Sequence, residues 1–188
     1  MNNINRIISA IITAAFIFSF TLSAVAEEPG RFQKGDKSIG IYLGASGFGD
    51  SSAVTLGGSF QYFVTGSTAP GIKAMGSFSD DNLYQGFVMV DQYLYTRGML
   101  LPFVFAEMGY YYSDLVYDTA VNVGGVDLDA DTRWKGAIYR LGAGVTSFVA
   151  ENAAIRGEMY YQWFYVDFDK KVPDLTGVGF SAGVSFFL

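Results

Sequence analysis

The final stretch of the chain, Gly177-Val178-Gly179-Phe180-Ser181-Ala182-Gly183-Val184-Ser185-Phe186-Phe187-Leu188, alternates between two kinds of side chain. Apolar residues occupy the even positions, and glycine or serine occupies nearly all of the odd ones. A period of two indicates a β-strand, because successive side chains of a strand point to opposite faces. In a soluble sheet the face away from the core would carry charges. Here that face is small and uncharged, which is typical of a strand between lipid and a narrow lumen.

Earlier segments of the chain show the same alternation. Val54 and Leu56, for example, alternate with Thr55 and Gly57. We therefore predict an all-β chain whose eight strands span residues 38–46, 52–64, 71–78, 83–95, 101–112, 134–148, 153–168 and 176–188. A strand of about ten residues, rising about 3.3 Å per residue and tilted by about 40°, climbs about 25 Å, the height of the apolar band of an outer-membrane barrel. An even number of strands closes without a free edge, so the predicted fold is an eight-stranded antiparallel up-and-down transmembrane β-barrel.

The predicted connections differ in length on the two sides. Segments 65–70, 96–100 and 149–152 are short, whereas two connections on the other side, 113–133 and 167–175, are long. Bacterial barrels have short periplasmic turns and long external loops, so we expect the long connections outside the cell. A soluble β-sandwich with uneven loops is the alternative, and it explains neither this asymmetry nor the lipid-type outer face.

The N-terminus has the pattern of a secretory signal. Arg6 precedes an apolar run from Ile7 to Val25, and Ala24-Val25-Ala26 is a small-x-small cleavage pattern. The expected organisation is therefore a cleaved signal at 1–26, a short periplasmic segment at 27–37 and the barrel at 38–188. A retained membrane anchor is the alternative, because the run is long enough to span a bilayer.

Composition limits the partners and the chemistry. The formal net charge is −6, which makes nucleic acid a poor partner. The chain has no cysteine and no histidine, which removes disulfides, thiol chemistry and the base that known barrel hydrolases use. We therefore expect neither a catalytic site nor a cofactor nor a dedicated metal site.

Three segments of the chain resemble segments of a known protein family. Residues 101–110, LPFVFAEMGY, are similar to a segment that reads RPYVGAGxGY in the small eight-stranded outer-membrane barrels of the OmpA and OmpX type. Residues 141–145, LGAGV, and 151–160, ENAAIRGEMY, resemble the sixth strand, short turn and seventh strand of that family. The resemblance implies the barrel fold, the bacterial outer membrane and surface roles carried by loops. Two departures are the final Leu188, where the family usually ends on an aromatic residue, and Glu107, where small residues are commoner.

Strand parity predicts what fills the lumen. Three cations and three anions are expected to face inward and to balance, namely Lys73, Asp91, Glu107, Arg140, Arg156 and Glu158. The expected aromatic filling is Tyr42, Phe103, Phe105, Tyr111 and Tyr160. Because an eight-stranded lumen is only about wide enough for its own side chains, we predict a plugged barrel. The alternative is that the charges form a gate or a proton path.

Aromatic residues near the strand ends are predicted to face outward. These residues are Tyr84, Tyr110, Tyr112, Tyr139, Tyr161, Trp163 and Tyr165. Rings of this kind suit the headgroup boundary of a membrane. A carbohydrate-binding platform is the alternative interpretation.

The long third connection is acidic and has no basic residue between 113 and 132. Its carboxylates belong to Asp114, Asp118, Asp127, Asp129 and Asp131. The triplet at 127–131 departs from an EF-hand, because Thr132 and Ile138 stand where that loop needs glycine and glutamate. We interpret the segment as a solvated external loop, with weak Ca²⁺ or Mg²⁺ association as the alternative.

The predicted function is that of a structural or surface-interaction protein acting in adhesion or envelope integrity. A minor channel for small or hydrophobic solutes is the alternative. The expected partners are outer-membrane lipid and lipopolysaccharide, a host or surface ligand at the loops, and the barrel-assembly machinery, which would read Phe186 and Leu188. A monomer is expected.

Overall fold

The computed structural model describes residues 31–48, 51–78, 82–94, 97–116, 121–123, 126–128, 133–166, 170–171 and 177–188. The predicted signal peptide at 1–26 lies outside these residues. No helix in the described part of the chain is long and apolar enough to cross a membrane.

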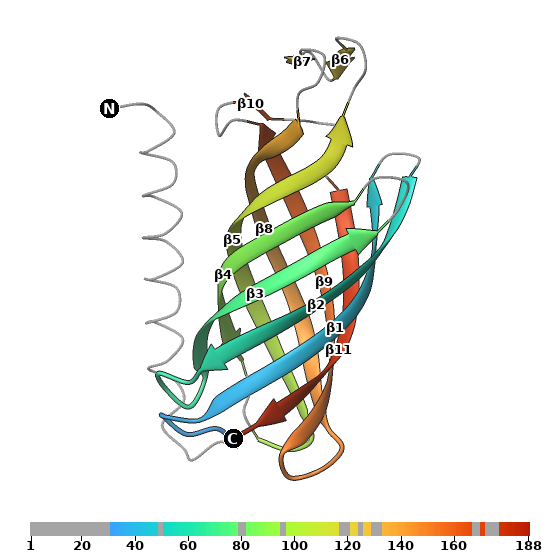
Figure 1. Ribbon diagram of the computed structural model, residues 1–188. Helices are drawn as coiled ribbons and strands as arrows, with labels where there is room; N and C mark the ends of the chain where they lie inside the picture. Colours follow the sequence, from blue (N-terminus) through green and yellow to red (C-terminus); the bar gives the residue numbers. More distant parts are fainter. Residues whose placement is uncertain are drawn as a thin grey trace, which may run out of the picture.

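Eight antiparallel strands close into a barrel (Figure 1). They are β1 Lys37–Phe48, β2 Ser51–Tyr62, β3 Thr68–Phe78, β4 Leu83–Tyr93, β5 Leu100–Val116, β8 Arg133–Phe148, β9 Ala153–Val166 and β11 Gly177–Phe187. Each strand pairs with its neighbour in sequence, and β1 pairs with β11 from Ser38↔Phe187 to Ser46↔Gly179 to complete the ring. The prediction of an eight-stranded up-and-down barrel is therefore confirmed.

The predicted strand ends need small corrections. Residues 68–70 belong to β3, although the sequence suggested a turn there, and β5 continues four residues beyond 112 to Val116. The alternation weakens at both places, since Pro70 and the polar residues after Tyr112 break the apolar series. Strands β2, β4 and β9 end earlier than predicted, at Tyr62, Tyr93 and Val166.

The connections differ between the two ends of the barrel. At the end that holds the C-terminus, residues 63–67, 94–99 and 149–152 join neighbouring strands. The opposite end carries the hairpin of β6 Val121–Val123 with β7 Val126–Leu128, and the short β10 Lys170–Lys171, which extends β9 (Figure 1). By the rule for bacterial barrels, this second end is the outer one.

The strand faces differ as their alternation predicts. On β11, Phe180 and Val184 are exposed, whereas Ser181 and Ser185 are buried. The apolar set therefore faces outward on this strand, and on β2 Leu56 and Phe60 do the same. A soluble domain buries its large apolar residues, so this exterior requires an apolar surrounding.

Glycine makes room for the aromatic rings inside the barrel. Phe103 on β5 lies directly across from Gly144, and Phe105 from Gly142. A Cβ atom added at Gly142 would meet the ring of Phe105 at 2.6 Å, closer than real contacts allow. This large-to-small pairing explains why the segment 141–145 alternates glycine with apolar residues.

A substitution at Val88 tests which solvent covers the exterior. Val88 lies in the middle of β4, faces outward and is 55% exposed. In a lipid bilayer, Val88→Arg is expected to lower the free energy of unfolding by about 2–4 kcal/mol, because arginine is costly near the midplane. The measurement is urea unfolding of the barrel in phospholipid vesicles.

Val88→Leu is the matched control and should leave stability nearly unchanged. On a water-exposed strand, Val88→Arg would shift stability by no more than about 0.5 kcal/mol, and that result would contradict a lipid-facing wall.

Candidate functional site in the barrel lumen

Six charged side chains occupy the lumen, each with at most 4% of its surface exposed. They are the ones that strand parity placed there: Lys73, Asp91, Glu107, Arg140, Arg156 and Glu158. They come from β3, β4, β5, β8 and β9, so only closure of the barrel brings them together.

The six charges form one chain of alternating sign. Lys73 at its centre pairs through Nζ with Glu107 Oε1 at 2.9 Å and with Glu158 Oε2 at 2.8 Å. From Glu158 the chain continues to Arg156, whose Nε lies 2.6 Å from Oε1. It ends at Asp91, whose Oδ2 lies 2.5 Å from Arg156 Nη1.

The other arm of the chain ends at Arg140. Its Nη1 lies 3.5 Å from Glu107 Oε2. Every carboxylate therefore has a cation within ion-pair distance, and every cation has a carboxylate. Self-neutralisation of this kind is what permits charges in a confined interior, since an unpaired buried charge costs several kcal/mol.

Neutral polar side chains complete both ends of the charge chain. Gln61 Nε2 donates to Asp91 Oδ2 at 2.5 Å, and Ser38 Oγ donates to Gln61 Oε1 at 3.1 Å. At the other end, Arg140 donates through Nε to Gln162 Oε1 and through Nη2 to Gln85 Oε1. The inward parity of these side chains in the sequence indicates that they face the lumen, but it does not show which charges they bind.

Aromatic rings cover the cations. The guanidinium carbon of Arg140 lies 4.4 Å from the centroid of Phe87 and 4.6 Å from that of Tyr160. The corresponding distance from Arg156 to Phe103 is 3.9 Å, and Lys73 Nζ lies 4.5 Å from the Tyr42 ring. Cation–π contacts of this kind add attraction where water is excluded.

All five aromatic residues predicted to fill the lumen are buried, which confirms that part of the prediction. They are Tyr42, Phe103, Phe105, Tyr111 and Tyr160.

An aromatic cap, which no sequence pattern predicts, closes the inner end of the lumen. Phe32, only 3% exposed, stacks on Phe63 at 4.3 Å between ring centroids and packs against Tyr93, Phe148 and Phe187. The described part of the segment predicted to be periplasmic, residues 31–36, lies across this end of the barrel, and Lys37 belongs to β1.

Polar contacts fix the capping segment in place. Gly35, at a φ of +105° that favours glycine, donates its N–H to the carbonyl of Phe63. Arg31 covers the Phe148 ring at 3.7 Å and donates Nη2 to the carbonyls of Ala150 and Glu151.

The other predicted site residues lie apart from the lumen. Phe186 and Leu188 are exposed on the outer face at the inner end. Tyr84, Tyr110 and Tyr161 are exposed, and Tyr112, Tyr139, Trp163 and Tyr165 are partly exposed. Asp114 lies in β5 and Asp127 in β7, but their side chains are outside the described part of the structure, as are residues 118, 129 and 131.

Comparison with known proteins gives likeness in structure only. No protein-family profile matches the chain, and no curated protein matches it. Solved structures do match. The N-terminal β-barrel domain of Pseudomonas aeruginosa OprF superposes with a TM-score of 0.61 at 18% identity, covering 83% of this chain and 98% of that one.

Two further barrels are similar over nearly their whole length. Neisserial surface protein A has a TM-score of 0.56 at 16% identity, with 80% of this chain and 94% of that one covered. The outer membrane protein OprG from P. aeruginosa has a TM-score of 0.53 at 13% identity, with 85% of this chain and 99% of that one covered. The fold is therefore that of the small eight-stranded outer-membrane β-barrels.

Removal of one cation tests the charge chain. Arg156→Met leaves Asp91 and one side of Glu158 without a cation, so we expect a loss of about 3–5 kcal/mol in the free energy of unfolding. Equilibrium unfolding in urea, followed by gel migration of the folded and unfolded forms, measures it.

The double variant Arg156→Met/Asp91→Asn separates pairing from packing. It removes the stranded charge of Asp91, so it should cost less than the sum of the two single variants. Strict additivity, or a loss below about 1 kcal/mol for Arg156→Met, would contradict a coupled network.

Proposed function

We propose that the protein is an integral outer-membrane protein whose lumen is plugged by its own side chains, and that it acts in surface interaction or envelope integrity through its outer connections. The observation that best supports a plugged lumen is the unbroken chain of ion pairs from Asp91 to Arg140. A continuous water column would have to separate those pairs.

The aromatic cap supports the same proposal. Phe32 and its neighbours fill the inner mouth, so a solute leaving the charged region would next meet packed rings. Two independent layers, one charged and one aromatic, thus occupy the axis of the barrel. If the lumen is plugged, only the surface of the barrel and its outer connections can contact partners. One fold can serve many functions, and the residues at its binding surfaces determine which one it serves.

The proposed partners follow from this arrangement. They are membrane lipid and lipopolysaccharide around the wall, a host or surface ligand at the connections 117–132 and 167–176, and the barrel-assembly machinery at Phe186 and Leu188. We assign no catalytic role and propose a monomer.

A minor channel for small or hydrophobic solutes is the second candidate. The observation that favours it is a set of buried polar atoms without a protein hydrogen-bond partner among the described residues, including Gln85 Nε2, Gln162 Nε2 and Tyr160 Oη. Such atoms can bind water, and water inside the lumen would be the start of a path.

Conductance and adhesion measured together separate the two candidates. The purified barrel in a planar bilayer is expected to show no steady single-channel current, because the ion pairs block the axis. Replacing residues 117–132 by a short Gly-Ser linker, which leaves β5 and β8 whole, is expected to reduce adhesion of expressing cells to the level of cells without the protein.

A scrambled 117–132 segment of unchanged length and charge is the matched control for that replacement. It should lose adhesion as the linker does if a specific sequence is recognised. Steady current from the wild-type barrel, together with adhesion that survives the replacement, would contradict the surface-interaction proposal and favour the channel.

A further inference from the structure

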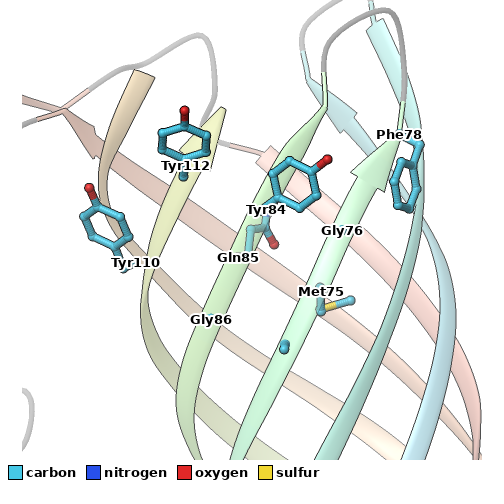
Figure 2. A pocket seen from close by; sticks show the side chains of 9 residues that line it. Met75, Gly76, Phe78, Tyr84, Gln85, Gly86, Tyr110 and Tyr112 are labelled. Atoms are coloured by element: carbon cyan, nitrogen blue, oxygen red, sulfur yellow. The ribbon is translucent and has the colours of Figure 1, made fainter. Parts of the chain in front are cut away.

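A hollow of about 510 Å³ lies on the outward face of β3, β4 and β5, toward their outer ends (Figure 2). It is an open depression in the wall rather than an enclosed cavity. Met75 and Gln85, which contact Arg140 in the lumen, also line it, but its other lining residues lie on the outward face, and neither the plug nor the outer connections explain them.

Strand register creates the floor of the hollow. Ala74 on β3 pairs with Gly86 on β4, and Gly76 lies two residues further along β3, so the small residues that line the hollow are adjacent on the outward face. In the next outward-facing row toward the inner end, Ile72 pairs with Val88. The surface of the barrel therefore drops where the small residues lie.

Aromatic rings form the rim. Tyr110 continues the row beyond Gly86, and Tyr84 and Tyr112 pair with each other in the next row outward. Figure 2 shows these three tyrosines and Phe78 standing around the hollow, with the tyrosine hydroxyl groups directed toward the outer ends of the strands. An apolar floor with hydroxyl groups on the outer side suits a ligand that is apolar at one end and polar at the other.

A cation stands next to this rim. Lys135 on β8 pairs directly with Tyr112 and is exposed on the same outward face. It lies at the outer end of the barrel, where the headgroups of the outer leaflet are expected. An anionic headgroup above the hollow would therefore meet a positive charge.

We propose that this hollow binds one acyl chain of lipid A, the diphosphorylated anchor of lipopolysaccharide, with Lys135 facing a lipid A phosphate. The apolar floor is continuous with the lipid-facing wall, so an acyl chain is what reaches it. The position at the outer end selects the outer leaflet, and the lysine selects an anionic headgroup over a zwitterionic one. The proposal rests on the proposed function and deepens it, because it assigns the lipopolysaccharide contact with the wall to one named site.

Filling the floor is the direct test. A Cβ atom built on Gly86 meets nothing within 4 Å, so Gly86→Leu adds a side chain to the hollow without a backbone clash. Gly157 on β9 has equally open surroundings and faces outward away from the hollow, which makes Gly157→Leu the matched control. Purified lipid A is titrated against each refolded barrel in detergent, and retained lipid is counted by native mass spectrometry.

The wild type and Gly157→Leu are expected to retain one lipid A with equal affinity, and Gly86→Leu to bind about tenfold more weakly. Lys135→Gln should weaken lipid A severalfold and leave binding of zwitterionic phosphatidylethanolamine unchanged; this variant and Tyr110→Ala test the site if Gly86→Leu does not fold. Undiminished lipid A binding by Gly86→Leu, or phosphatidylethanolamine retained as tightly as lipid A by the wild type, would overturn the proposal. Failure of the membrane location itself would appear instead in the Val88→Arg measurement.

Discussion

Hydrocarbon offers a polypeptide no hydrogen-bond partner, so each N–H and C=O group of a membrane-spanning strand must find one within the protein. The pairing of β1 with β11 meets that demand, because it joins the first and last strands and leaves no open edge. Closure also gives every strand one face toward the membrane and one toward a narrow interior. The sequences of β2 and β11 alternate between apolar and small or polar residues because successive side chains face these two surroundings in turn.

Confinement inside the closed ring determines what the inward face can hold. Aromatic rings need space, and the glycines across from Phe103 and Phe105 supply it. Charges need counter-charges, and the alternating chain from Asp91 to Arg140 supplies them. The described interior is therefore filled by aromatic rings and paired charges. In the proposed function, the outer connections and the outward wall are the parts that meet partners.

Parity explains why so much of this arrangement could be predicted from sequence. A strand has only two faces, so an inward Glu158 on β9 fixes Arg156 as inward as well, and both are buried. Parity says nothing about which charges meet, because Lys73 reaches Glu107 and Glu158 only through the register of separate strands. The cap could not be predicted for the same reason: Phe32 lies outside any alternating segment, and its partners come from four different strand ends or turns. The hollow near Gly86 likewise depends on register across three strands.

A spin-label scan along β11 tests most directly whether hydrocarbon covers the apolar face. Single cysteines at positions 178 to 186, each carrying a nitroxide, would be measured in phospholipid vesicles for collision with oxygen and with a water-soluble nickel chelate. We predict a period of two, in which labels at Val178, Phe180 and Val184 collide strongly with oxygen and weakly with nickel, while labels at Ser181 and Ser185 collide weakly with both. Nickel collision at the even positions as strong as that of a label in bulk water would contradict the account.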